Sequence, residues 1–352
     1  MHPEFWRGRR VFVTGHTGFK GGWLVLWLRQ AGAEVTGFAL ASGAFPSLFE
    51  AARVGDGIRS VIGDVRDAPA LSAALRESDA EVVFHLAAQS LVRESYLRPA
   101  DTYATNVMGT VHLLDAVRST PAVRAAVIVT SDKCYENREW RWPYREIDRL
   151  GGRDPYSNSK ACAELVTSAY RASFFSGAAP VGLATGRAGN VIGGGDWAKD
   201  RLVPDLLRAF ADGTAATIRN PDAVRPWQHV LDPVHGYLVL AEALLSDGAL
   251  SDAWNFGPDP VDVRPVRWVA DELAARWGSG ASWVGDAGIH PHEALTLRLD
   301  SSRARAELAW RPRLAVGTAL DWTVEWYRAW LGAPRQAQAL TLQQILRYQD
   351  MA

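Results

Sequence analysis

The chain has 352 residues, of which 48% are hydrophobic and 22% are charged, the balance of a globular protein large enough for about two domains. Its 38 Lys and Arg residues are offset by 39 Asp and Glu residues, for a formal net charge of −1, so we expect neither nucleic acid nor a membrane surface as a partner. Cys134 and Cys162 are the two cysteines; they exclude a disulfide framework and, with a start that lacks the apolar segment of a signal peptide, predict a cytoplasmic protein.

Hydrophobic segments of strand type and helix type alternate through the first 190 residues. Short apolar runs predict strands at 10–13, 33–40, 61–64, 81–86, 125–130 and 182–188. Apolar residues at helical spacing predict helices at 18–31, 68–77, 106–117 and 156–173. This alternation favours a parallel sheet covered on both faces, so the expected fold class is α/β with a doubly wound, Rossmann-type sheet.

The pattern changes after residue 190, where glycine and proline become frequent and the segments become short. We therefore assign residues 1–190 to the Rossmann domain and residues 191–352 mainly to a smaller substrate-binding lobe with a C-terminal helix. An apolar run at 230–245 predicts a long helix, and we expect the segment near 230–256 to return to the first domain. Two more helices are predicted at 267–277 and 336–349.

The first strand leads into a glycine-rich segment at 15–21, with the glycines spaced G-x-x-G-x-x-G. Glycine permits a tight turn and lets backbone N–H groups approach phosphate oxygens, and the helix that follows adds partial positive charge. Because the motif joins a strand to a helix, it predicts a dinucleotide-binding loop rather than an ordinary glycine turn. His16 either crowds the phosphates or simply fills the loop. The candidate cofactor contacts here are Gly15, His16, Thr17, Gly18, Phe19 and Gly21.

Further candidate cofactor contacts follow the third and fourth strands. Asp64 either accepts a hydrogen bond from the adenine amino group or, like Asp67, caps the next helix. Small residues at 85–89 let the backbone lie close to the cofactor. The second strand ends at 38–42 without an acidic residue for the ribose hydroxyls, which leaves the choice between NAD and NADP open. The full set is Asp64, Val65, Leu86, Ala87, Ala88, Gln89 and Asn106.

Tyr156 and Lys160 are four residues apart and share one face of a predicted helix. An unperturbed tyrosine has a pKa of about 10. A nearby ammonium and an oxidised nicotinamide would lower that pKa, so that the phenolate can accept a proton from a sugar hydroxyl. Ser131 follows the fifth strand, at the carboxyl edge of the sheet, and can hydrogen-bond the same hydroxyl. The alternative to a catalytic role is a purely structural pair, with a buried tyrosine beside a surface lysine. The glycine loop earlier in the chain favours the catalytic interpretation.

Together with Arg-Ala-Gly-Asn at 187–190, these residues resemble the extended short-chain dehydrogenase/reductases that act on nucleotide sugars, over nearly the whole chain. Within that superfamily, four segments resemble the CDP-glucose 4,6-dehydratases. They are Gly-His-Thr-Gly-Phe-Lys-Gly at 15–21, Ser-Asp-Lys-Cys-Tyr-Glu-Asn at 131–137, Gly-Gly-Gly-Asp-Trp at 193–197 and Arg-Pro-Trp-Gln-His-Val at 225–230. In sugar-nucleotide 4,6-dehydratases generally the aspartate is followed by glutamate, and Lys133 takes that place here, as it does in the CDP-glucose branch.

The resemblance implies a hydro-lyase that uses NAD to convert CDP-glucose into CDP-4-keto-6-deoxyglucose, for the synthesis of deoxysugars in surface polysaccharide. Tyr156 would accept the C4 hydroxyl proton, and a protonated Asp132 would help the C6 hydroxyl to leave as water. Lys133 would act at C5, either as a neutral base or as an ammonium that stabilises the enolate. The implied catalytic set is Ser131, Asp132, Lys133, Tyr156 and Lys160, of which Tyr156 and Lys160 also contact the cofactor.

Arginine and amide side chains of the second half are the implied substrate contacts. By the same resemblance, Asn190, Arg201 and Arg225 hold the sugar and the diphosphate, since a guanidinium suits a bidentate diphosphate contact. Arg219 and Asn220 lie where this superfamily often meets the nucleotide base. For any single arginine the alternative is a solvated surface charge. Gln89 and Ser131 complete the candidate substrate contacts.

Three further expectations concern metals, assembly and rival functions. No metal is expected, because His229 and His292 lack acidic or cysteine partners at metal-ligand spacing. The resemblance implies a homodimer or higher oligomer built on the helices at 106–117 and 156–173. The rival functions are another nucleotide-sugar dehydratase, a 4-epimerase, or a non-catalytic dinucleotide-binding sensor. An epimerase needs no elimination acid, and a sensor does not need the whole catalytic set.

Overall fold

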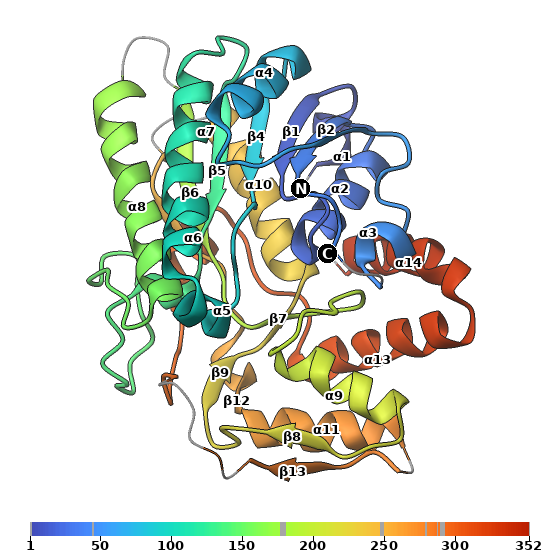
Figure 1. Ribbon diagram of the computed structural model, residues 1–352. Coiled ribbons are helices and arrows are strands. Elements are labelled where there is room, and N and C mark those ends of the chain that lie inside the picture. Colours follow the sequence, from blue (N-terminus) through green and yellow to red (C-terminus); the bar gives the residue numbers. More distant parts are fainter. Residues whose placement is uncertain are drawn as a thin grey trace.

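The computed structural model describes residues 2–43, 46–176, 181–246, 250–278, 280–286, 288 and 293–351. Its centre is a parallel seven-stranded sheet in the order β11-β6-β5-β4-β1-β2-β3 (Figure 1). The order reverses between β1 and β4, and ligands bind in the crevice at such a switch point. The six predicted strands are confirmed. The strands are β1 (Arg10–Thr14), β2 (Glu34–Ala39), β3 (Arg59–Ile62), β4 (Val82–His85), β5 (Ala125–Val129), β6 (Gly182–Arg187) and β11 (Ala253–Asn255).

Helices cover both faces of this sheet, because successive side chains of a strand point to opposite sides. Val11 and Val13 of β1 join a large apolar core with α2 and α10, whereas Phe12 joins a second core with α4 and α7. Figure 1 shows α7 and α8 side by side on that second face. The doubly wound α/β fold is therefore confirmed. These helices are α2 (Phe19–Gln30), α4 (Ala68–Ser78), α7 (Gly109–Arg118), α8 (Pro155–Phe174) and α10 (Leu231–Ser246).

The helix predicted at 106–117 is the end of a longer composite helix. Its first part, α6 (Pro99–Tyr103), continues through a π-helical turn, η1 (Ala104–Met108), into α7. Asn106 lies in this turn, where its side-chain amide donates to Gln89 O at 2.9 Å and to Ser159 Oγ at 2.8 Å. Single π turns are frequent at functional sites, and this one ties the end of β4 to α8.

Part of the second half adds to the first sheet. The predicted long helix is α10, which packs on β5 and β6, and β11 pairs with the edge of β6. The sequence analysis did not single out α9 (Leu202–Ala211) or α13 (Val316–Gly332). The predicted C-terminal helix is α14 (Ala337–Gln349), which packs against α2 and α13. Within the described ranges, no helix combines the length and apolar character needed to cross a bilayer.

Three two-stranded ladders and several short elements complete the fold. The ladders pair β7 (Val191–Ile192) with β10 (Gln228–His229), β8 (Ala216–Ile218) with β13 (Trp283–Gly285), and β9 (Val224–Pro226) with β12 (Val263–Pro265). The remaining elements are α1 (Pro3–Trp6), α3 (Leu48–Ala51), α5 (Val92–Leu97), η2 (Asp132–Cys134), η4 (Pro260–Asp262), α11 (Val266–Trp277), α12 (Ser302–Glu307) and η5 (Pro334–Gln336).

Candidate active site

A cavity of about 540 Å³ lies at the carboxyl edge of the sheet and extends into the smaller lobe. Its lining includes eight Lys and Arg residues and six Asp and Glu residues, so the cavity carries positive charge although the whole chain does not. Such a lining suits anionic groups like diphosphates. Most candidate residues line this cavity; His16, Gln89 and Asn106 are the candidates that lie outside its lining.

The glycine loop has the geometry of a diphosphate cradle. Gly15 has a φ of +79°, and a Cβ there would lie 2.7 Å from Ala87 N. A Cβ on Gly21 would lie 2.1 Å from Gly15 O, so the loop and the first turn of α2 touch backbone to backbone. Gly18 is the N-cap of α2 and supplies no side-chain acceptor for the first N–H groups. These groups therefore suit a phosphate at the helix N-terminus, and the loop fits a dinucleotide.

His16 points away from the cavity, behind the loop. Its ring is fully buried, hydrogen-bonded to Ser60 Oγ at 2.7 Å and packed edge-on against Phe49. Burial lowers the pKa of His16 to about 4, although a hydrogen bond with the Phe38 backbone opposes this, so the ring is neutral at pH 7. The structure therefore favours the interpretation that His16 fills the loop.

Asp64 and Asp67 take different positions after β3. Asp67 caps α4, where its Oδ1 accepts a hydrogen bond from Ala70 N at 3.0 Å. Asp64 lines the cavity, and its carboxylate accepts hydrogen bonds from Arg66 Nε at 2.9 Å and Nη2 at 2.6 Å. The hydrogen bonds and charge of Arg66 lower the pKa of Asp64, so an ionised acceptor faces this end of the cavity.

Tyr156 and Lys160 stand on the first two turns of α8. Pro155 begins this helix, and the Asp154 side chain caps it by accepting from Ser157 N. Lys160 Nζ donates to Val129 O, at the end of β5, at 3.2 Å. Burial raises the pKa of Tyr156 to about 12, opposed by a hydrogen bond with the Ser131 hydroxyl, and burial lowers the pKa of Lys160 to about 8. A cation near Tyr156 is therefore needed before the phenolate can form at neutral pH.

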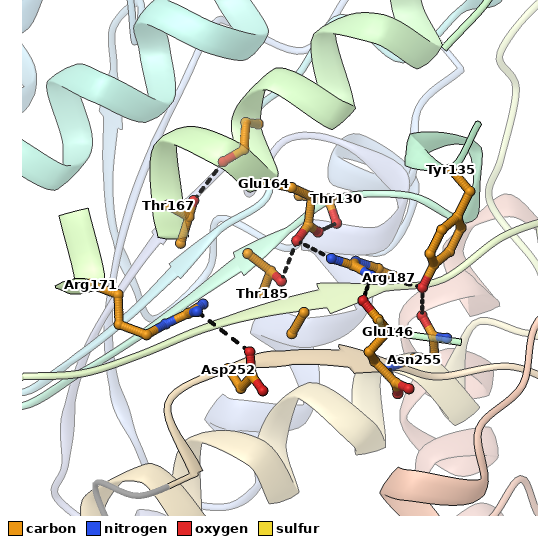
Figure 2. A network of polar contacts seen from close by, with 12 residues as sticks. Thr130, Tyr135, Glu146, Glu164, Thr167, Arg171, Thr185, Arg187, Asp252 and Asn255 are labelled. Atoms are coloured by element: carbon orange, nitrogen blue, oxygen red, sulfur yellow. Dashed lines mark hydrogen bonds and ion pairs between the residues drawn. The ribbon is translucent and has the colours of Figure 1, made fainter. Parts of the chain in front are cut away.

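A buried ion pair fixes α8 against the sheet. Glu164 and Arg187 are each 3% exposed, and Arg187 Nη2 donates to Glu164 Oε2 at 2.7 Å (Figure 2). The hydroxyls of Thr130 and Thr185, from the end of β5 and from β6, donate to the same carboxylate. Glu164 lies one turn after Lys160 on α8, so this network fixes the position of Tyr156 and Lys160 relative to the strand ends.

Asp132 is an unusual carboxyl group for a polar cavity, because it is 1% exposed. Its Oδ1 accepts from Ser131 Oγ at 3.1 Å, whereas its Oδ2 is buried with no hydrogen-bond partner among the described residues. Burial raises the pKa of Asp132 even though Lys133 and Ser131 oppose the shift. Gly189 makes room for the group, since a Cβ there would lie 1.8 Å from Asp132 Oδ2. A protonated Asp132 can act as an acid.

Lys133 follows directly in the same short helical turn, η2. Burial and the charge of Arg225 lower its pKa, while the charges of Glu293, Asp132 and Asp154 raise it less. The lowered pKa makes a neutral amine accessible. Lys133, Arg225 and Glu293 line both this cavity and a second one of about 220 Å³.

The arginines of the second half are held in different ways. Arg225 is 6% exposed, and its terminal nitrogens donate to the backbone oxygens of Val224, Ala294 and Leu295, so it anchors the chain around residue 294. Arg201 donates to Asp196 Oδ2 at 2.9 Å and to Ser90 Oγ at 2.8 Å. Asn190, Arg219 and Asn220 also line the cavity.

The sequence analysis missed several residues of the cavity wall. Lys20 of the glycine motif is one; its Nζ donates to Tyr237 Oη at 3.2 Å, and burial lowers its pKa to about 7, with the charges of Lys160 and Arg201 adding to the shift. Its place within the motif was the available signal. Arg93, Asp200 and Glu293 are further charged examples, and they come from segments without any sequence signal.

Known proteins that are similar to this chain share its fold. Residues 11–257 match the model of the NAD dependent epimerase/dehydratase family. The CDP-glucose 4,6-dehydratase of Salmonella typhimurium is 55% identical over 336 residues, which cover 94% of each chain. A dTDP-glucose 4,6-dehydratase from Streptomyces venezuelae, solved with NAD and TYD bound, is 26% identical with a TM-score of 0.77 over 92% of this chain and 98% of that one.

A UDP-glucose 4-epimerase from Thermotoga maritima has a TM-score of 0.80 over 91% of this chain and 99% of that one. At 21% identity this second structure shows the fold alone. The match to the family model spans the glycine loop, the whole parallel sheet and the Tyr156–Lys160 helix. This chain therefore belongs to the NAD dependent epimerase/dehydratase family.

Proposed function

We propose that the chain is an NAD-dependent CDP-glucose 4,6-dehydratase, a hydro-lyase that forms CDP-4-keto-6-deoxyglucose and serves deoxysugar synthesis. The observation that carries the proposal is that Ser131, Asp132, Lys133, Tyr156 and Lys160 converge on one cavity beside a dinucleotide cradle. The 55% identity to a CDP-glucose 4,6-dehydratase supports the choice of substrate.

The first half-reaction takes place at C4 of the sugar. NAD held by the glycine loop at 15–21 would supply a hydride acceptor for C4 and a hydride donor for C6. Tyr156, as the phenolate, accepts the C4 hydroxyl proton, and the ammonium of Lys160, one turn away on the same helix face, favours this ionised form. Ser131 lies between Tyr156 and Asp132 and holds the reacting hydroxyl.

The second half-reaction removes water across C5 and C6. The 4-ketone acidifies the C5 hydrogen, and Lys133 acts at this carbon. Its lowered pKa supports the role of a neutral base, which becomes an ammonium that Glu293 and Asp154 can stabilise. This ammonium can return the proton to C5 when C6 receives the hydride. Asp132 donates its proton to the departing C6 hydroxyl, which leaves as water. Burial raises the pKa of Asp132, which favours its protonated form.

The rival functions explain fewer of these features. A 4-epimerase needs the C4 machinery but no buried acid, so Asp132 and Lys133 would have no role in it. A dinucleotide-binding sensor would need the cradle alone.

The test is incubation of the purified protein with NAD and CDP-glucose, beside UDP-, dTDP- and GDP-glucose, with products read by mass spectrometry. We expect a loss of 18 mass units, one water, from CDP-glucose without net reduction of the cofactor. Tyr156→Phe, the control, should abolish this loss while the protein still binds NAD. Turnover of another nucleotide sugar in preference to CDP-glucose, or of none, contradicts the proposal.

We also propose that the protein is a cytoplasmic homodimer in which α7 and α8 of two copies form a four-helix bundle. Apolar side chains on these helices and the adjoining turn support it: Met108, Leu165 and Phe174 are 45%, 59% and 50% exposed. Cys134 and Cys162 are unpaired, which suits a reducing compartment. Sedimentation at micromolar concentration should give the dimer mass. A monomer mass for the wild type would contradict the proposed homodimer. If the four-helix bundle is correct, replacing Leu165 with Arg should convert the dimer into a monomer.

A further inference from the structure

One carboxylate at the rim of the cavity joins two arginines from distant parts of the chain. Asp200 Oδ1 accepts hydrogen bonds from Arg93 Nη1 and from Arg219 Nη1, each at 2.9 Å. Arg93 belongs to α5 and Arg219 follows β8, so the contact bridges the Rossmann half and the smaller lobe. All three side chains line the cavity, as does the neighbouring Asn220.

Both members of the Asp200–Arg219 pair keep unused hydrogen-bonding atoms. Asp200 Oδ2 accepts no hydrogen bond from the described residues, and Arg219 Nε and Nη2 donate none to them. The pair therefore presents an acceptor next to donors. Asn220 adds an amide to the same stretch of the lining.

The charge state of Asp200 is fixed by its two partners. Burial alone would raise its pKa, but hydrogen bonds from Arg219 and Arg93 outweigh burial and lower it. Asp200 is thus a carboxylate at neutral pH, which accepts hydrogen bonds and cannot donate them. Arg93 donates to the same oxygen of Asp200, Oδ1, as Arg219 does, and acts as a positioning residue.

This arrangement of one acceptor beside donors matches the hydrogen-bonding edge of cytosine. Cytosine presents the N4 amino donor next to the N3 and O2 acceptors, and Asp or Glu commonly accepts from N4 while Arg donates to ring acceptors. Uracil and thymine present the O4 acceptor and the N3–H donor instead. Against those bases the carboxylate would face O4, which is also an acceptor, and the guanidinium would face N3–H, which is also a donor. Neither contact could form a hydrogen bond.

We propose that Asp200 and Arg219 are specificity-determining residues that read the cytosine edge of the substrate's nucleotide, with Asp200 accepting from the N4 amino group. This inference rests on the proposed function for its substrate, and it assigns the base selection to two named side chains. Asp200 and Arg219 are 36% and 23% exposed, so their mutual ion pair is weak and does not prevent either side chain from turning toward a base.

The test compares CDP and UDP binding by calorimetry in the full-length wild type and in Asp200→Asn. Asparagine suits this position because Asp200 has a φ of +62°, a conformation that asparagine adopts as readily as aspartate. A matched control is Asp205→Asn, which removes a carboxylate from the same cavity wall, one that is paired with Arg208 and not with Arg219. Thermal melts verify that each variant is folded.

We expect the wild type to prefer CDP over UDP and Asp200→Asn to reduce that preference by about 10- to 100-fold, the usual discrimination by one good base contact. Asp205→Asn should keep the wild-type preference. Equal affinities of the wild type for CDP and UDP, or equal losses for both nucleotides in Asp200→Asn, would overturn the inference, because equal losses indicate a contact to the diphosphate. An intact base preference in a protein that dehydrates no sugar would instead defeat the proposed function and leave the base reading standing.

Discussion

Replacing Glu164 with glutamine should destabilise the protein far more than the loss of an ordinary surface charge. Its carboxylate balances the charge of Arg187 where both side chains are 3% exposed, and it accepts two threonine hydroxyls as well. Glutamine keeps the volume but leaves the buried guanidinium without a counter-charge, which costs about 3–5 kcal/mol. With 352 residues and an unfolding entropy of about 2.1 cal/mol/K per residue, the loss corresponds to about 4–7 °C in Tm.

The effect should depend on pH in a defined direction. Burial would raise the pKa of Glu164, but the charge of Arg187 and the hydrogen bonds outweigh it and lower the pKa. A carboxyl group with a lowered folded-state pKa stabilises fully above its unfolded pKa of about 4.3, and the contribution is lost as the pH falls through the folded value. The Tm difference between wild type and variant should therefore be largest near neutral pH and shrink below about pH 4.

Calorimetric melts at about pH 7 and about pH 3, on either side of the unfolded pKa of the carboxyl group, measure both parts of this prediction. Glu325→Gln is the matched control, since its ion pair with Arg347 is 42% and 39% exposed and should contribute at most about 1 kcal/mol. If Glu164→Gln lowers Tm no more than this control, the buried pair does not stabilise the native state and the reasoning is wrong. Because α8 also carries Tyr156, the variant should lose turnover at temperatures where it is still folded.

Three more predictions concern the cavity. Glu293→Gln removes a charge that raises the pKa of Lys133, so the limb of the kcat/KM–pH profile that reports Lys133 should move to lower pH. An unmoved limb would show that Glu293 does not influence the ionisation of Lys133. Asp132→Asn should keep single-turnover reduction of the cofactor, read by absorbance, while water loss slows by about 10²–10⁴-fold, as expected on removal of a general acid; equal loss of both steps would deny Asp132 that role. Gly21→Ala should abolish NAD binding in fluorescence titrations, because the new Cβ would lie 2.1 Å from a loop carbonyl, whereas Gly43→Ala, which meets no atom within 4 Å, should bind normally.

Local signals in the sequence were sufficient for the Rossmann half and for its two motifs. Strands of the central sheet are short apolar runs that are buried on both faces, so their composition alone marks them. The glycine loop and the Tyr156–Lys160 spacing are also local, because backbone turns and helical periodicity follow from neighbouring residues. The helices α9 and α13 had no comparable cap or spacing signal that the sequence analysis recognised.

Tertiary structure decided which polar side chains meet and which do not. The sequence left two roles open for His16, and contacts with Ser60 and Phe49, more than 30 residues away, turn it out of the cavity. The terminal nitrogens of Arg225 donate hydrogen bonds to the backbone oxygens of Ala294 and Leu295, about 70 residues downstream.

The Asp200 contacts extend this point to substrate selection, because Asp200 receives Arg93 from a helix 107 residues earlier. Motif spacing reflects interactions within a few residues, whereas charge pairing, burial and the resulting pKa shifts depend on groups that only the folded chain brings together. The amino-acid sequence by itself therefore determined the dinucleotide-binding fold and the placement of Tyr156 and Lys160 on one helix, and the tertiary structure decided how the cavity around them is charged.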